Sequence, residues 1–323
     1  MTSQNISSAI VTSYPEENLY EMDPPVFNLT PKSMEAFLAL DTPEFLQGAL
    51  QQTRKTGVNP LFLMHGTSPL YLADRRLAYA RLPLSAYQKP PPLPEIELPD
   101  DVAFVEQLNK QGNTVLVVVR IGGELRLVKI FPEQEPDHVL DRVDADGPES
   151  CGLRDVAVDR FEQEKQAYAH LLHYGACAKG VVPHCYGWLE LTSEHRQKIS
   201  AVPGGEGIII ALPRIEGPVR AILLEYFSEA VRLSYENLTE KLAEQAMRGL
   251  HQIHAAYVVH GDLHRRNILV LPGDRIVWVD FNFSRTPSGD LSCRRQELFQ
   301  ELHSGWCEFY SKMLPNKRIG YLY

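Results

Sequence analysis

Along the middle of the chain, short apolar runs of the kind that form β-strands are separated by polar positions and glycines. The runs 102–108, 115–121 and 125–131 are rich in β-branched and aromatic residues and are separated by glycines. This pattern predicts a three-stranded antiparallel meander. The acidic stretch 133–149 that follows is expected to be a solvated loop.

Farther along, helical periodicity alternates with short apolar runs. Helices are expected over 156–174, 238–255 and 293–313, and strands over 185–191, 207–212, 219–227 and 275–280. Asn237 with Glu240 three residues later resembles a capping box at the start of the second of these helices. A small sheet with one helix therefore precedes a mainly helical part, which predicts an α+β fold with two lobes.

The first hundred residues have a different composition. Residues 1–30 are polar and contain scattered prolines, and we expect them to be disordered. Pro31 and Pro43 each stand in the first turn of a short predicted helix. The proline-rich segment 89–99 predicts a stiff, extended linker. The chain thus divides into an extension, residues 1–100, and a domain, residues 101–323, with a division between its lobes near residue 227.

Composition excludes several classes of protein. The 323 residues carry a formal net charge of −9, which argues against nonspecific binding to nucleic acid or to an anionic membrane. The apolar runs are too short to span a bilayer, and the N-terminus lacks the basic start and apolar core of a signal peptide. Five cysteines in a chain of this length do not make a disulfide framework. We expect a cytoplasmic protein, and a nuclear location stays open.

The candidate chemistry lies in a loop near the C-terminal end. His260-Gly261-Asp262 is followed five residues later by Asn267, and Asp280-Phe281 comes thirteen positions after Asn267. An Asp, an Asn and a second Asp at these offsets are the catalytic-loop and metal-ligand spacing of phosphoryl transfer. Carboxylate and amide oxygens are the ligands that Mg²⁺ prefers.

This loop resembles that of the protein-kinase-like superfamily, and most of all its short fungal kinase-like and aminoglycoside- or choline-type phosphotransferases, which favour HGD over HRD. The resemblance covers residues 102–313 and implies a bilobal fold with a truncated, mainly helical second lobe. It implies ATP and Mg²⁺ as cofactors. Asp262 would be the base that orients the acceptor hydroxyl, and Asn267 and Asp280 would hold the metal.

Lys129 and Glu164 are the expected partners in the first lobe. By resemblance Lys129 would pair the α- and β-phosphates; an exposed strand lysine is the alternative. Glu164 falls within an apolar helical stripe that contains Phe161 and Tyr168. A buried carboxylate is costly unless paired, so we predict an ion pair with Lys129. The alternative is a solvated glutamate at the edge of the stripe.

Further roles rest on the resemblance. His264 stands two residues after Asp262, where it would contact phosphate, and Arg265 or Arg266 would supply permanent charge unless both serve solubility alone. The segment from Glu225 to Phe227 resembles the hinge whose backbone binds adenine. Gly112 would belong to the loop that covers the phosphates.

The chain departs from the family pattern at several places. Gly112 is the one glycine that fits the glycine-rich loop, and Leu127 stands where a small residue usually touches adenine. Asn282 replaces the glycine after Asp280-Phe281, and Gly261 replaces an arginine that would read a phosphorylated activation loop. No A-P-E triplet follows, so we do not expect regulation by loop phosphorylation.

Two functions follow from this pattern. The first is a phosphotransferase acting on an unidentified hydroxyl or amine acceptor, with a small molecule slightly favoured over a protein. The alternative is a catalytically weak or inactive pseudokinase that serves as a binding or scaffold module, with residues 1–100 as an arm for a protein partner. The acidic stretch 133–149 would suit a cationic acceptor if it faced the site.

Overall fold

The computed structural model describes residues 43–57, 87–108, 114–132, 136–144, 151–202, 205–291, 293 and 295–321. The predicted disorder of residues 1–30, the first of the two short helices and Gly112 lie outside these ranges.

The first lobe is built on a five-stranded antiparallel sheet with the order β1-β2-β3-β7-β6. The strands are β1 (Ala103–Gln107), β2 (Val115–Ile121), β3 (Glu124–Phe131), β6 (Cys185–Glu190) and β7 (Arg220–Glu225). The predicted meander is present as β1 to β3. Gly122 and Gly123 both have positive φ, at 56° and 89°, and make the tight turn between β2 and β3. Val117, Val119 and Val128 are completely buried against the core of this lobe.

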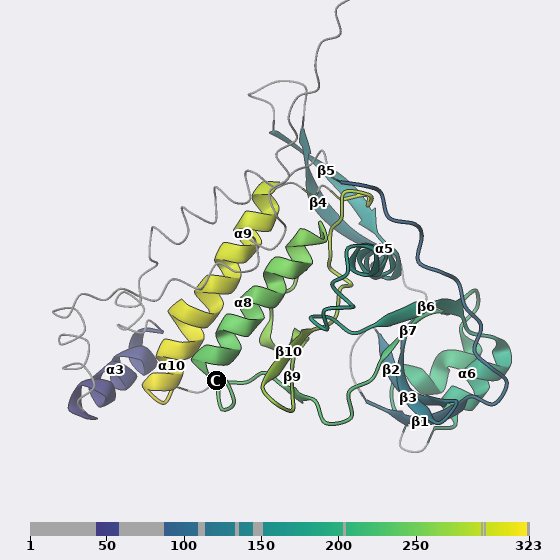
Figure 1. Cartoon of the computed structure of the whole chain (residues 1–323), viewed down its shortest axis with the longest axis horizontal. Coiled ribbons are helices and arrows are strands. Elements are labelled where there is room, and N and C mark those ends of the chain that lie inside the picture. Colours follow the sequence, from purple (N-terminus) through teal and green to yellow (C-terminus); the bar gives the residue numbers. More distant parts are fainter. Residues whose placement is uncertain are drawn as a thin grey trace, which may run out of the picture.

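Two helices, α5 (Arg160–His173) and α6 (Ser193–Ser200), pack beside this sheet (Figure 1). Helix α5 begins at Asp159, whose carboxylate accepts the Phe161 N–H at 2.9 Å. After α6, a single turn, α7 (Ile208–Ala211), leads into the 3₁₀ turn η3 (Leu212–Arg214).

The predicted strand over 207–212 is wrong. Ile209 and Leu212 are fully buried whereas Ile210 is 58% exposed, and this spacing of three is that of a helix. A short apolar run does not by itself distinguish a buried helical turn from a strand.

The acidic loop expected over 133–149 is also wrong. Strands β4 (Asp137–Asp144) and β5 (Cys151–Val158) pair along their full length as an antiparallel hairpin that projects from the body of the molecule (Figure 1). The sequence of β4, DHVLDRVD, has no alternation of polar and apolar residues, and its pairing with β5 is what makes it a strand. The predicted helix start at residue 156 therefore moves to Arg160, because Val156 to Val158 belong to β5.

The second lobe is mainly helical. Helix α8 (Glu240–Ala255) lies beside α9 (Arg295–Trp306), which continues through the π-helical segment η5 (Cys307–Met313) into α10 (Leu314–Arg318) (Figure 1). Strands β8 (Val231–Arg232), β9 (Ile268–Leu271) and β10 (Arg275–Trp278) form a small sheet. None of the described helices is both long and apolar enough to cross a bilayer.

The N-terminal cap of α8 differs from the prediction. The hydroxyl of Thr239 accepts the Leu242 N–H at 3.2 Å and caps the helix. Asn237 instead accepts the Ser234 N–H in the preceding turn. Both residue types favour caps and turns, and the sequence offers both within three positions.

The proline-rich segment is extended, as expected, and it is packed on the first lobe. We call residues 87–98 the strap. Ile96 donates its N–H to Trp188 O at 2.8 Å, and Trp188 donates to Pro94 O at 3.0 Å, so the strap lies along the edge of β6. Its Leu93 and Leu98 are buried. Gly187 in β6 makes the close approach possible, because a Cβ there would lie 2.6 Å from Pro94 O. The predicted boundary near residue 100 thus separates the strap from the lobe on which it packs.

Farther towards the N-terminus, helix α3 (Pro43–Thr56) starts at the predicted proline. Its Ala49 packs with Ile319 after α10. The described parts of the extension therefore contact both lobes. The segment that contains His260-Gly261-Asp262 lies between α8 and β9, and we call it the HGD loop. This loop, the sheet with α5 and the helical second lobe form a bilobal protein-kinase-like fold (Figure 1).

Candidate active site

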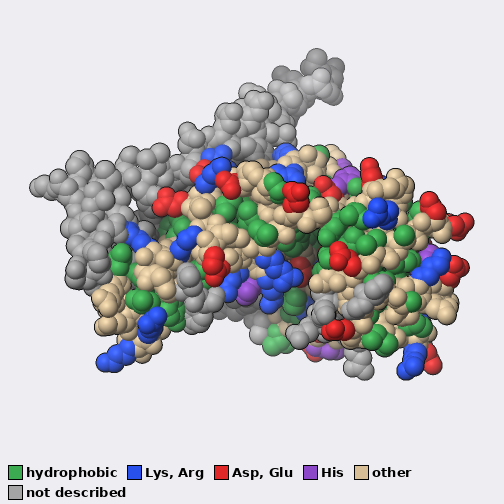
Figure 2. All heavy atoms as spheres, turned by 90° about the horizontal axis from the view of Figure 1, so that it is seen from below, with side chains coloured by type: hydrophobic (Ala, Val, Ile, Leu, Met, Phe, Trp, Pro, Cys, Tyr) green, Lys and Arg blue, Asp and Glu red, His purple; other side chains and the backbone are tan. Residues whose placement is uncertain are grey.

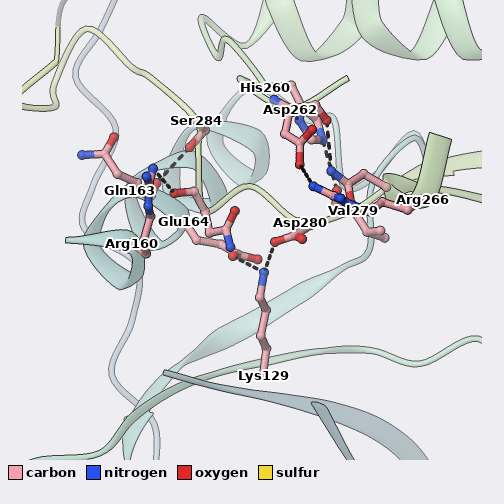
Figure 3. A network of polar contacts seen from close by, with 12 residues as sticks. Lys129, Arg160, Gln163, Glu164, His260, Asp262, Arg266, Val279, Asp280 and Ser284 are labelled. Carbon is pink, nitrogen blue, oxygen red and sulfur yellow. Dashed lines mark hydrogen bonds and ion pairs between the residues drawn. The ribbon is translucent and has the colours of Figure 1, made fainter. Parts of the chain in front are cut away.

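Lys129 lies in the middle of β3 and points into the space between the lobes. Its ammonium group contacts the carboxylate of Glu164 and lies 2.5 Å from Asp280 Oδ1 (Figure 3). The residue is 4% exposed, so the alternative of an exposed strand lysine does not hold. Burial opposes the charge on Lys129, but Glu164 and Asp280 outweigh it and raise the pKa of the ammonium.

Glu164 comes from α5 and is completely buried. Burial raises the pKa of its carboxyl to about 7, against the opposing effect of Lys129 and of a hydrogen bond from the Phe281 backbone. The alternative of a solvated glutamate therefore does not hold either. The contact between Glu164 and Lys129 joins α5 to the sheet, and the contact between Lys129 and Asp280 joins both to the second lobe.

Replacing Lys129 by Met should destabilise the protein by about 3 kcal/mol at pH 8, because two carboxyl groups lose their shared cation. The loss should be smaller at pH 5. A carboxyl whose pKa is raised in the folded state favours folding at low pH and loses that contribution as pH rises through its folded pKa, so a protonated Glu164 tolerates the change best. Urea unfolding at both pH values measures the effect.

The double variant Lys129→Met/Glu164→Gln is the control for this interpretation. It removes one of the two carboxyl groups that lost their cation, the completely buried one, so it should recover part of the stability at pH 8 and little at pH 5. Equal losses for Lys129→Met at the two pH values would contradict the assignment.

Asp280 follows β10 with φ at 71°, a conformation that Asp adopts more readily than most residues. Burial raises the pKa of Asp280, but Lys129 lowers it more, so the carboxylate is ionised. The turn at Asp280 places the ring of Phe281 inside the core, 5.5 Å from Tyr168 of α5 and 4.6 Å from His260 (centroid distances). Phe281, the residue after Asp280, thus packs between α5 and the HGD loop through these ring contacts.

The expected base and the expected metal ligand are held in one loop. Asn267 donates from Nδ2 to the backbone oxygen of Asp262 at 3.0 Å, which fixes the amide and makes Oδ1 the atom that could bind a metal. Asp262 accepts the His264 N–H at 3.3 Å and the guanidinium of Arg266 at 2.9 Å (Figure 3). Burial raises the pKa of Asp262, but the hydrogen bonds from Arg266 and Asn267 have the larger combined effect, so the pKa of the carboxyl is lowered overall.

His264 caps the turn that follows Asp262, and its expected contact with phosphate stays a prediction. Its Nδ1 accepts the Arg266 N–H at 3.2 Å and so caps the short turn η4 (Arg265–Asn267). Burial and the charges of Arg266 and Arg265 lower the pKa of His264, which keeps the ring neutral at pH 7. The permanent positive charge at this loop belongs to the arginines.

Two residues that hold the loop were missed from the sequence. Gly261 has φ at 83° and lies against the backbone of Phe283. From the sequence, Gly261 was noted only as the replacement of an arginine, and its structural role was not predicted. Glu301 of α9 accepts the N–H groups of His260 at 2.8 Å and of Gly261 at 2.7 Å, and it contacts His254 Nε2 at 2.8 Å. Glu301 lies between Leu298 and Leu302 on the buried face of its helix, and this signal could have identified it, as it identified Glu164.

The expected hinge follows β7. The N–H of Glu225 donates to His184 O at 2.8 Å, and its carboxylate accepts the His184 N–H at 3.1 Å. The carbonyl of Phe227 accepts the Ala230 N–H at 3.3 Å. The side chain of Glu225 is therefore occupied, and adenine would have to use backbone groups here.

The residues at the cleft have the chemistry that a nucleotide with Mg²⁺ requires. Asn267 and Asp280 each present a hard oxygen, and two protein ligands are usual where phosphate oxygens and waters complete the shell. In the described part of the chain, no group of three or more His, Cys, Asp or Glu side chains forms a metal site of its own. Two of the three N–H groups of the Lys129 ammonium are used by Glu164 and Asp280, which leaves one for a phosphate oxygen.

Comparison with known proteins identifies the family. The family model described as "Kinetochore Sim4 complex subunit FTA2" matches residues 91–283, which is more than half of the 323 residues. The chain belongs to the FTA2 family. The matched range includes most of the strap as well as Lys129, Glu164, Asp262, Asn267 and Asp280.

Other comparisons add little to the FTA2 assignment. One solved structure similar to this FTA2-family chain, "Structure of vaccinia related kinase 3", is 12% identical with a TM-score of 0.40, and the match covers 73% of this chain and 72% of that one. No curated protein matches the chain. The fold assignment rests on the arrangement of the sheet, α5 and the HGD loop.

Proposed function

We propose that this FTA2-family chain is a kinetochore subunit whose kinase-like domain binds ATP with Mg²⁺ and transfers the γ-phosphoryl group to an acceptor hydroxyl. The observation that carries the proposal is the double contact of Lys129 with Glu164 and Asp280. Lys129 is a cation buried between the carboxylates of Glu164 and Asp280, and the same fold supplies the amide oxygen of Asn267. Such a set has the charge distribution of a site for phosphates and a divalent metal.

Each residue has a part in this proposal. Lys129, held by Glu164, would bind phosphate oxygens, and Asn267 and Asp280 would hold Mg²⁺. The metal ion would neutralise charge that develops on the phosphates. Asp262 would orient the acceptor hydroxyl and take up its proton. The HGD loop agrees with the finer resemblance to the short aminoglycoside- and choline-type phosphotransferases, which supports a hydroxyl-bearing acceptor over an amine.

The family description supports a chromosomal setting. A subunit of a kinetochore complex acts in the nucleus, so we propose that location in place of the cytoplasm, and we propose protein partners in the same complex.

The second candidate is a binding module without turnover. The family description supports it, because a complex subunit needs no catalysis. The contact of Arg266 with Asp262 also supports it, since the guanidinium covers one oxygen of the expected base.

Thermal unfolding of the full chain with ATP, with Mg²⁺ and with both tests the proposal. A ligand that binds only the folded state stabilises it by about 2.7 kcal/mol at 100 times its Kd, which raises the midpoint. We expect a rise that needs both ligands and is lost in Asp280→Asn. Asp274→Asn is the matched control, because Asp274 is an exposed aspartate that also has positive φ, at 62°.

Asp262→Asn separates the two candidates. This variant should keep the rise in midpoint and reduce ADP formation by about 100-fold or more, because general-base catalysis is of that size. No rise at millimolar nucleotide in the wild type would reject the nucleotide site. A normal rise without any ADP formation in the wild type would favour the binding module.

A further inference from the structure

Permanent positive charge lies beside the expected base of a chain that is acidic overall. The net charge of the protein is −9, yet Arg265 and Arg266 follow Asp262 within four residues. Basic side chains gather near the middle of the face in Figure 2, beside the hollow between the two halves of the molecule. An acceptor that approaches Asp262 therefore meets two arginines beside that carboxylate.

Arg266 stands where an acceptor hydroxyl has to bind. Its guanidinium lies 2.9 Å from Asp262 Oδ2, and its side chain is 55% exposed whereas that of Asp262 is 20% exposed. The more exposed arginine thus contacts the less exposed carboxylate directly (Figure 3). A hydroxyl that is to bond this oxygen must displace the guanidinium, and the displaced charge then needs another partner.

The neighbouring charged groups do not provide that partner. Arg265 is held over the ring of Tyr235 at 4.8 Å, and the facing Glu308 of η5 already pairs with Lys312 at 3.0 Å. In the acidic hairpin β4–β5, Asp137 is already paired with Arg160 at 2.6 Å. A displaced Arg266 is therefore left to water, unless the acceptor itself brings an anionic group.

We propose that the acceptor carries a carboxylate or phosphate group next to its hydroxyl, and that Arg266 moves from Asp262 onto this group and so selects an anionic acceptor. The proposal rests on the phosphotransferase function proposed above. An arginine fork matches the paired oxygens of a carboxylate or phosphate, so one charge-assisted bond replaces another. A neutral or cationic acceptor provides no such replacement and leaves Arg266 on the base.

The transfer balances with these groups. The acceptor oxygen forms a bond to the γ-phosphorus while the bond from that phosphorus to the leaving oxygen of ADP breaks. The hydroxyl proton goes to Asp262, which Arg266 has left.

Binding of matched probes without nucleotide tests the proposal. The first pair is a serine peptide flanked by Asp and Glu and one of equal length flanked by Lys and Arg, both measured by fluorescence anisotropy. The second pair is glycerol 3-phosphate and choline, measured by the shift of the unfolding midpoint. The two pairs distinguish a protein segment from a small molecule as the source of the anion.

We expect the anionic member of at least one pair to bind more tightly, and Arg266→Gln to weaken it about tenfold, as for a lost hydrogen bond between charged groups. Arg248→Gln is the matched control, because Arg248 is 51% exposed and is also paired with a carboxylate four residues away. It should leave both affinities unchanged.

Three results would overturn the proposal: equal or tighter binding of the cationic probes, equal losses in Arg266→Gln and Arg248→Gln, or no binding of either anionic probe. The midpoint shift with ATP and Mg²⁺, measured on the same samples, reports on the phosphotransferase site separately. A normal shift with failed anionic probes rejects the anionic acceptor alone, whereas an absent shift rejects the nucleotide site.

Discussion

Gly261→Ala should unfold the protein at much lower denaturant than the wild type, with a loss of about 4 kcal/mol or more. The backbone of Gly261 has φ at 83°, where any other residue is strained by about 1–2 kcal/mol. In addition, an added Cβ would collide with the carbonyl group of Phe283, whose carbon lies 2.7 Å from the Cβ position. Backbone cannot move aside as the end of a side chain can, so the loop or the segment after Phe281 has to shift.

Gly273→Ala is the matched control for this prediction. Gly273 has nearly the same φ, at 80°, and a Cβ there meets nothing within 4 Å. It should therefore show the conformational cost alone, about 1 kcal/mol. Urea unfolding of the two variants, followed by circular dichroism, gives the difference. Similar losses for both would mean that the close approach to Phe283 is not a constraint.

Glu301→Ala should cost about 3–5 kcal/mol, the second large effect. The carboxylate accepts the N–H groups of His260 and Gly261 and contacts His254, all in the buried interior. Truncation leaves these donors without an acceptor, which is the expensive way to break a buried polar network. Because the N–H groups belong to the HGD loop, the same variant should also impair whatever Asp262 does.

The conservative variant Glu301→Gln should also lose stability, since an amide has one acceptor oxygen where the two loop N–H groups use two. Burial raises the pKa of Glu301, but the bond from His254 and the neighbouring charges lower it more. A carboxylate with a lowered pKa contributes stability above its ordinary pKa and loses it as pH falls. The gap between wild type and Glu301→Gln should therefore narrow towards pH 4.

Glu297→Ala is the control on the same helix. Glu297 pairs with Arg285 at 3.3 Å in a partly exposed position, and such pairs contribute about 0–1 kcal/mol. Chemical denaturation at pH 7 compares the three variants. A loss in Glu301→Ala no greater than in Glu297→Ala would exclude the role of Glu301 in holding the loop.

Strands and helices with a strong period could be predicted from the sequence, and so could the pairing of Glu164. A charged residue inside an apolar stripe needs a partner wherever the helix is buried, and the resemblance to kinases indicated Lys129 as that partner. The same reasoning applied to α9 identifies Glu301, but its partners are backbone N–H groups, which leave no trace in side-chain identity. The close approach at Gly261 is likewise a property of two backbones far apart in sequence.

The errors have a common physical origin. Residues 207–212 are apolar without a clear period, so tertiary packing chose a helical turn for them. Acidic composition predicted a loop over 133–149, yet β4 pairs along its full length with β5. In both cases the structure depends on the segment that each run packs against or pairs with. The local sequence of the run does not show which segment that is.

The strap has a practical consequence for expressing the domain. A protein truncated at residue 101, where the composition changes, would expose the core residues on which Leu93 and Leu98 pack and the edge of β6 that Pro94 and Ile96 cover. Bare strand edges invite aggregation. Expression of the kinase-like domain should therefore start upstream of residue 87, so that the recombinant product retains its own edge protection.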